Sequence, residues 1–142
     1  MVEIKLSLEQ MRYIGIFESL TGASVKDCLV NGETILFVVE PGNAARAIGR
    51  KGVNVERASK VLKKKVEVVE YAEPLETFVK SIFIPARIVS VQVYQDKDGR
   101  KRVRVYPEVE DQGLAIGKNG RNVEKARLLL KRYYDIDVVE IK

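Results

Sequence analysis

The stretch Ala47-Ile48-Gly49-Arg50-Lys51-Gly52-Val53-Asn54-Val55-Glu56-Arg57-Ala58 returns as Ala115-Ile116-Gly117-Lys118-Asn119-Gly120-Arg121-Asn122-Val123-Glu124-Lys125-Ala126. The two copies are displaced by 68 positions, from Ala47 to Ala115. Each copy places two glycines around a dipeptide with basic character, between two segments that look helical. The chain is therefore predicted to be a tandem repeat.

A chain of 142 residues fits one ordinary domain or two small ones, and the repeat favours two of roughly seventy residues each. Glu73-Pro74 marks the predicted boundary, because a proline drives the residue before it toward extended geometry and readily opens a new helix. We therefore expect one domain over residues 1–72 and a second over residues 73–142.

Signals for helices and strands follow one order in the first half. Ser7 and Gln10 form a predicted capping box, and Thr21-Gly22 ends the helix that follows. Strand-like runs at 25–30 and 35–39 are joined by Asn31-Gly32, the dipeptide that a type I′ hairpin turn prefers. After a short helix and the glycine loop, a longer helix carries an apolar stripe, and a strand closes the half at 65–71. The stripe comprises Val55, Ala58, Val61 and Leu62.

The second half repeats this order. A helix is predicted over 75–83, then strands at 87–94 and 101–106 that are joined by a turn at Asp98-Gly99. After the second glycine loop a long helix carries its own stripe, and a strand closes the chain at 136–141. That stripe comprises Val123, Ala126, Leu129 and Leu130. The sequence thus predicts an α+β fold in which each domain runs helix, strand, strand, helix, glycine loop, helix, strand.

The composition removes several classes of function. The chain has no histidine and a single cysteine, which excludes an internal disulfide, a Cys/His zinc site and any catalytic triad that relies on imidazole. Cys28 lies in a strand-like run with no base beside it, so it is expected to be a small buried apolar residue rather than a nucleophile. We expect no bound metal and no cofactor.

The chain reads as a soluble protein. Hydrophobic residues make up 46% and charged residues 32%, and no run approaches the roughly 20 apolar residues that span a bilayer. The opening residues, 1–5, lack the basic start and apolar run of an export peptide. We therefore expect a cytoplasmic protein without a membrane segment.

Positive charge gathers around both glycine loops. The net charge of +5 is modest and by itself supports solubility as well as nucleic-acid binding. Residues 46–65, however, hold eight basic side chains and one acidic one, and residues 118–132 hold six and one. A lysine-rich helix with a solvated face is the alternative for either segment alone. Recurrence beside the same loop in both halves favours a functional surface.

A Gly-x-x-Gly bend between two helices suits a phosphate chain. Glycine lets the backbone turn sharply and removes the side chain that would hold a ligand backbone away. The following helix points unpaired amide N–H groups and the positive end of its dipole at the loop. Arg50, Lys51 and Lys118 can add charge-assisted contacts to phosphate oxygens, and Asn119 can donate a hydrogen bond.

Several residues near the loops allow two interpretations. Ile48 and Ile116 either form an apolar floor for splayed bases or simply anchor helix ends. The three tyrosines Tyr71, Tyr133 and Tyr134 are either stacking residues or, more often at such positions, core residues. An alternating run of arginines shares one strand face, which is either a second electropositive surface or an ordinary solvated edge. The run comprises Arg100, Arg102 and Arg104.

The element order and the two loops resemble tandem KH domains of type II, and the resemblance covers nearly the whole chain. A stand-alone pair of this kind is similar to the archaeal NusA-like transcription termination factors, whose bacterial relatives carry the pair with additional domains. The resemblance implies binding of single-stranded RNA during transcription elongation or termination, with about four nucleotides in each groove. The implied RNA-binding residues are Ile48, Gly49, Arg50, Lys51, Gly52, Ile116, Gly117, Lys118, Asn119 and Gly120.

Three other functions are alternatives to RNA binding. An enzymatic nucleotide site fails on spacing, because residues 113–119 have three residues between the glycines where a P-loop has four, and Asn119 follows the lysine where a P-loop has Ser or Thr. A ribosome-associated KH protein and a protein-binding adaptor remain as alternatives, since a fold does not assign a function. RNA polymerase is the candidate protein partner, and we expect a monomer.

Overall fold

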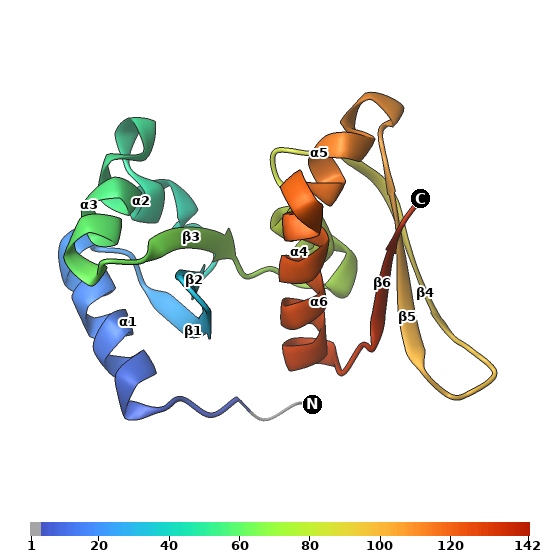
Figure 1. Ribbon diagram of the computed structural model, residues 1–142, viewed down its shortest axis with the longest axis horizontal. Coiled ribbons are helices and arrows are strands. Elements are labelled where there is room, and N and C mark those ends of the chain that lie inside the picture. The colour runs from blue at the N-terminus through green and yellow to red at the C-terminus, as the bar shows by residue number, and fades with distance from the viewer. Residues whose placement is uncertain (1–3) are drawn as a thin grey trace. The chain divides into compact units, whose positions relative to one another are not determined.

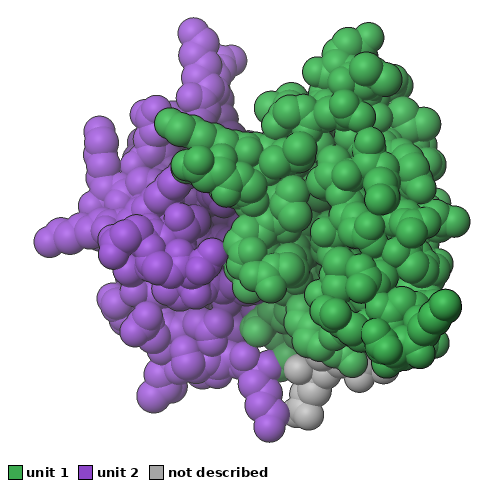
Figure 2. Space-filling model, turned by 45° about the vertical axis from the view of Figure 1, so that its right-hand side comes forward, with its two compact units in different colours: residues 1–4, 73–142 green, residues 5–72 purple. Residues whose placement is uncertain are grey.

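The computed structural model describes residues 4–142 of the chain. Residues 1–3 lie outside the described residues. They belong to the opening segment, residues 1–5, which is predicted not to be an export peptide. Contacts divide the described chain into two compact units, and residues 5–72 and 73–142 make up the bulk of them. Figure 2 shows the units in purple and green. Each unit is described by itself below.

The first unit begins with a capped helix. The Ser7 hydroxyl accepts a hydrogen bond from the Gln10 amide at 3.1 Å, and the Gln10 side chain accepts one from the Ser7 amide at 2.8 Å. Gly22 ends the helix in the left-handed conformation with φ of 74°, so both predicted end signals are confirmed. The elements are α1 (Leu8–Thr21), β1 (Val25–Asn31), β2 (Thr34–Val39), α2 (Ala44–Ile48), α3 (Val53–Leu62) and β3 (Lys65–Glu70).

The second unit has the same order, with a shorter first helix and a longer last one. Helix α4 has 9 residues where α1 has 14, and α6 has 14 where α3 has 10. The elements are α4 (Leu75–Phe83), β4 (Ile88–Gln95), β5 (Lys101–Pro107), α5 (Gln112–Ile116), α6 (Arg121–Tyr134) and β6 (Val138–Ile141). The α+β fold and the repeated element order are therefore confirmed.

Each unit is a three-stranded sheet with its helices packed on one face. The strand orders are β1-β2-β3 and β4-β5-β6. In both sheets the first two strands are antiparallel and the last two are parallel. Helices α1 and α3 pack over β1 and β3, and α4 and α6 pack over β4 and β6. Figure 1 shows this two-layer arrangement most clearly in the second unit. Parallel pairing requires a crossover, and the two helices that flank the glycine loop provide it.

Aromatic and aliphatic side chains fill a separate core in each unit. In the first, Phe17 from α1 stacks on Phe37 from β2 with ring centroids 4.1 Å apart, and both side chains are fully buried. Cys28 is also fully buried, as expected of a small apolar residue. In the second, Phe78 packs edge-on against Tyr133 at 5.6 Å. Among residues 4–142, no helix combines the length and apolarity needed to cross a lipid bilayer.

Two local predictions were wrong in detail. The first hairpin turn is Gly32-Glu33 rather than Asn31-Gly32, because Asn31 still pairs with Thr34. Gly32 has a φ of 60°, which suits the first central position of a type II′ turn. In the second hairpin the predicted turn at Asp98-Gly99 is part of a longer link. The strands are joined by residues 96–100, and Gly99 has a φ of 80°.

The apolar stripes of the two long helices are not equivalent. Val61 was expected to face the core of the first unit, yet it is 53% exposed, whereas its counterpart Leu129 is fully buried. Helix α3 ends at Leu62, so Val61 lies in the last turn. Leu129 lies well inside α6, the helix against which α4 packs. Two residues that the repeat makes equivalent thus differ in burial, and the shorter α3 ends one residue after Val61.

Candidate nucleic-acid interface

The two glycine loops have the same backbone geometry. Gly49 and Gly117 have φ, ψ of 78°, 168° and 80°, 166°. A single 3-10 turn follows in each loop, and Gly52 and Gly120 then start α3 and α6 at 78°, 16° and 74°, 18°. The Gly52 amide donates to the Gly49 carbonyl at 3.1 Å, and the same bond recurs in the second loop at 3.1 Å. Sequence repetition is thus matched by repetition of the fold.

The first glycine of each loop is required for space as well as for conformation. A Cβ atom at Gly49 would lie 2.8 Å from Cγ of Asn54, and one at Gly117 would lie 2.9 Å from the amide nitrogen of Asn122. Both contacts are closer than real Cβ atoms tolerate. A Cβ at Gly52 would meet nothing within 4 Å, so the second glycine is required by its positive φ alone.

An asparagine two residues after each loop closes the bend. Nδ2 of Asn54 donates to the carbonyl of Arg46 in α2 at 2.8 Å, and Nδ2 of Asn122 donates to the carbonyl of Leu114 in α5 at 2.8 Å. The last carbonyls of a helix have no partner within it, so the side-chain amide supplies one. Both asparagines belong to the repeated stretch, but their role was not recognised from the sequence, where nothing marks them as facing back across the loop.

The third residue of each loop adopts the left-handed helical conformation. Lys51 has φ, ψ of 55°, 26°, and Asn119 has 58°, 28°. Asparagine tolerates this region because its short side chain can hydrogen-bond locally, whereas a lysine there is strained. The first loop, which carries two cations, therefore has a strained lysine at its third position. The second loop has an asparagine there, which is less strained.

The predicted phosphate-binding side chains are exposed. Arg50, Lys51, Lys118 and Asn119 all project into solvent. Within the part of the chain that the structure describes, Arg50, Lys51 and Lys118 form no ion pair. No side chain caps the first turn of α3 or of α6. Each loop thus offers a positive helix end with exposed cations beside it, which suits an anion.

The remaining basic residues differ between the units. On α6, Arg127 pairs with Glu124 at 2.7 Å, and Lys131 contacts Asp135 at 2.7 Å and Asp137 at 3.0 Å. The hydrogen bonds that the Lys131 ammonium donates to Asp135 and then Asp137 raise the pKa of Lys131 above its ordinary value. These two basic side chains are therefore engaged within the protein, and the positive surface of the second unit is weaker than the sequence count implies.

Exposed apolar side chains border both loops. Ile48 and Ile116 are 40% and 41% exposed, and Val53 and Leu114 are each 45% exposed. Part of each isoleucine side chain therefore faces solvent beside its loop. Side chains of this kind beside a phosphate-binding loop provide a surface against which unstacked bases can pack.

Two of the three tyrosines lie apart from their glycine loop. Tyr133 and Tyr134 end α6, about 20 Å along the helix from its loop at 1.5 Å per residue. Tyr133 packs against the fully buried Phe78, which agrees with a core role. In the first unit, Nζ of Lys26 lies 4.5 Å from the centroid of the Tyr71 ring.

The arginine face of the second sheet is largely compensated by acids. Arg100 lies outside β5, so only Arg102 and Arg104 share the strand face. Arg102 contacts Asp96 at 2.7 Å and Glu140 at 3.5 Å, and the Arg102 hydrogen bond lowers the pKa of Asp96. The guanidinium of Arg104 lies 4.3 Å from the centroid of the Tyr94 ring. On this face Arg102 is thus paired with two acids, and Arg104 packs on an aromatic ring.

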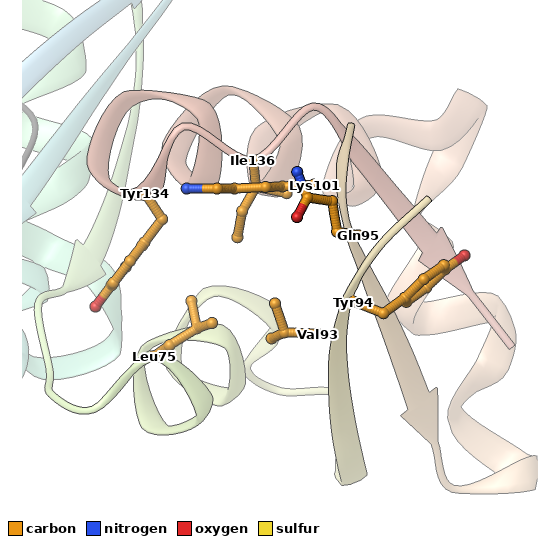
Figure 3. A pocket seen from close by; sticks show the side chains of 7 residues that line it. All are labelled: Leu75, Val93, Tyr94, Gln95, Lys101, Tyr134 and Ile136. Carbon is orange, nitrogen blue, oxygen red and sulfur yellow. The ribbon is translucent and has the colours of Figure 1, made fainter. Parts of the chain in front are cut away.

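A pocket of about 350 Å³ opens in the second unit, away from its glycine loop. Apolar side chains from α4, β4 and the end of α6 line it, with Lys101 at its edge, and the Tyr94 side chain points away from it (Figure 3). The apolar lining comprises Leu75, Val93, Tyr134 and Ile136. Because Tyr134 ends α6 and Ile136 follows it, both lie at the opposite end of the helix from the glycine loop, and the pocket is separate from that loop.

Comparison with known proteins identifies the repeat. Residues 75–142 match the NusA-like second KH domain, and residues 11–97 match the KH domain. The chain is 37% identical to the probable transcription termination protein NusA of Halococcus morrhuae, covering 99% of both chains. It is 32% identical to the protein of that name from Methanocaldococcus jannaschii, covering 99% of this chain and 76% of the relative.

A solved structure agrees with these matches. The crystal structure of APE1850 superposes with a TM-score of 0.87 at 39% identity, covering 96% of this chain and 100% of the other. The arrangement of two α+β units, each with a glycine loop between its second and third helices, is that of tandem KH domains of type II.

Proposed function

This chain belongs to the archaeal NusA-like transcription termination proteins with KH domains, and from that premise we propose that it binds single-stranded RNA at both glycine loops during transcription. The observation that carries the proposal is the identical bend in both units, with exposed cations beside an uncapped helix start. Each loop holds phosphates through backbone N–H groups and basic side chains, while bases pack on the apolar border. The protein acts as a binder rather than as an enzyme.

The proposed contact set has two equivalent parts. In the first unit it comprises Ile48, Gly49, Arg50, Lys51 and Gly52, and in the second Ile116, Gly117, Lys118, Asn119 and Gly120. The first loop carries two cations and the second only one. Because each phosphate neutralised on a single strand adds about 0.7 to the slope of log affinity against log salt, the first loop contributes more of the affinity.

Charge reversal in the first loop tests this proposal. Arg50→Asp combined with Lys51→Asp removes two phosphate contacts, which lowers the salt slope by about 1.4 and the affinity about 25-fold at 0.1 M salt. The fold should persist, because both side chains are exposed and aspartate tolerates the left-handed conformation. Fluorescence anisotropy with labelled single-stranded RNA measures both quantities.

A matched control reverses two charges elsewhere. Lys97 and Arg100 are exposed in the loop between β4 and β5, so Lys97→Asp with Arg100→Asp changes the net charge equally without touching a glycine loop. Only the long-range part of the affinity should change, and screening makes that part small at 0.1 M salt. Equal losses for the two double variants would refute loop-specific binding. Lys118→Asp with Asn119→Asp extends the test to the second loop.

A second part of the proposal concerns the location, the oligomeric state and the protein partner. We place the protein in the cytoplasm as a monomer, with RNA polymerase as its protein partner, because the relatives are named as transcription termination proteins. Co-purification with polymerase after nuclease treatment, together with sedimentation of the free protein, checks both parts. Capture of ribosomal components instead would favour the ribosome-associated alternative, and capture of a protein by a chain that binds no RNA would favour an adaptor.

A further inference from the structure

The asparagines that follow the two loops are the only side chains among the described residues that bridge a loop in both units by the same hydrogen bond. Asn54 reaches from the first turn of α3 to the Arg46 carbonyl in α2, and Asn122 reaches from α6 to the Leu114 carbonyl in α5, each at 2.8 Å. The four loop residues lie between the two ends of this bond. It therefore fixes where α2 stops relative to where α3 starts.

Few other restraints hold the bend. Helix α2 has only five residues. At the loop, the backbone amides of Gly49, Gly52 and Val53 donate to the carbonyls of Ala45 at 2.9 Å, of Gly49 at 3.1 Å and of Arg50. None of these backbone bonds crosses the whole loop. The Asn54 side chain also fills the space that a Cβ at Gly49 would take, so glycine and asparagine fit together as a pair.

We propose that Asn54 and Asn122 are positioning residues for RNA binding, which hold the loop amides in the conformation that receives a phosphate without contacting the RNA themselves. The inference rests on the proposed function. A loop that is already ordered binds with its full intrinsic affinity, whereas a loop that samples other conformations loses affinity in proportion to the time it spends in them. Removing the side-chain amide leaves the cations and the glycines in place.

The test uses the full chain with the second loop disabled by Lys118→Asp and Asn119→Asp, so that binding reports the first loop alone. In this background Asn54→Ala should weaken binding of labelled single-stranded RNA about 3- to 10-fold, the loss expected for one hydrogen bond. Hydrogen exchange of the amides at residues 50–53 in the free protein should become about tenfold faster. The salt slope should stay unchanged, because Arg50 and Lys51 remain.

Asn31→Ala is the matched control, since Asn31 is exposed at the end of β1 in the same unit and lies outside the loop. It should change neither the affinity nor the exchange of the loop amides. The reciprocal variant, Asn122→Ala with the first loop disabled, gives an independent measurement if Asn54→Ala fails to fold.

Each other outcome overturns the inference. Weaker binding with unchanged loop exchange would make Asn54 a direct RNA contact. Faster exchange with unchanged binding would show that loop order does not matter. If the chain with an intact first loop binds no RNA, the proposed function fails and the inference with it. Full-strength binding by Asn54→Ala would overturn the inference alone.

Discussion

Replacing Lys51 by asparagine should stabilise the first unit and weaken its RNA binding at the same time. Lys51 has a φ of 55° and Asn119, its counterpart, has 58°. A residue with a β-carbon pays roughly 1–2 kcal/mol for this conformation, and asparagine recovers part of it through local hydrogen bonds. We therefore expect Lys51→Asn to stabilise the unit by about 0.5–1 kcal/mol, which is about 2–8 °C in the unfolding temperature of a domain of this size.

The loss of affinity follows from the lost charge. One phosphate contact contributes about 0.7 to the salt slope for a single strand, which is about fivefold in affinity at 0.1 M salt. Thermal unfolding followed by circular dichroism gives the stability, and RNA titrations at several salt concentrations give the slope. The reverse change, Asn119→Lys, should destabilise the second unit and tighten binding.

Lys63 provides a control with the same backbone conformation outside the loop. It caps the end of α3 at φ of 57°, about 15 Å from the helix start at 1.5 Å per residue. Lys63→Asn should give the same gain in stability and leave the salt slope unchanged. Our reasoning would be refuted if Lys51→Asn lowered the stability, or if the two variants altered RNA binding equally.

Three further changes probe the packing and the charges. Gly49→Ala should cost at least 2 kcal/mol in urea unfolding because its Cβ meets Asn54, whereas Gly52→Ala should cost only about 1 kcal/mol because the added atom has room; equal costs would contradict the steric argument. Phe17→Ala should destabilise the first unit by about 3–5 kcal/mol by emptying the fully buried stack on Phe37, and a loss below 1 kcal/mol would show that the site collapses. Hydrogen bonds hold the pKa values of four carboxylates of the second unit below their ordinary values of 3.8 for Asp and 4.5 for Glu. The stability that these groups add is therefore complete above the ordinary pKa values. It is lost as the pH falls through the lower pKa values of the folded state. Acid titration monitored by NMR should therefore disrupt the second unit's contacts below about pH 4, and a stability that stays constant down to pH 2 would contradict this. The four are Asp96, Asp111, Asp137 and Glu140.

Local signals predicted the elements well because they act over a few residues. The capping box at Ser7 and the glycine stop at Gly22 appear at the ends of α1 as expected, since both depend on hydrogen bonds and backbone conformations within one turn. The hairpin turn was misplaced by one residue. Its position follows from the register of β1 on β2, which the packing of whole strands selects and a dipeptide preference does not.

Long-range packing decides which side chains are buried and which charges are paired, and the sequence repeat does not show either. Val61 and Leu129 are equivalent in the alignment of the two halves, yet one is half exposed and the other is fully buried. The arginines of β5 allowed two interpretations from the sequence, an electropositive surface or a solvated edge, and the fold brings Glu140 of β6 and Asp96 of the hairpin beside Arg102. Partners that are 38 positions apart, as Arg102 and Glu140 are, cannot be read from spacing along one strand.

By itself the amino-acid order determined that the chain contains two copies of one α+β plan and that each copy bends at a pair of glycines with cations beside it, because helix periodicity, caps and turns are short-range properties. Only the tertiary structure decided that Lys51 sits in a strained conformation, that the first glycine of each pair faces an asparagine, and that several basic residues are already paired. These outcomes depend on which backbone atoms come within a few ångströms of one another after folding.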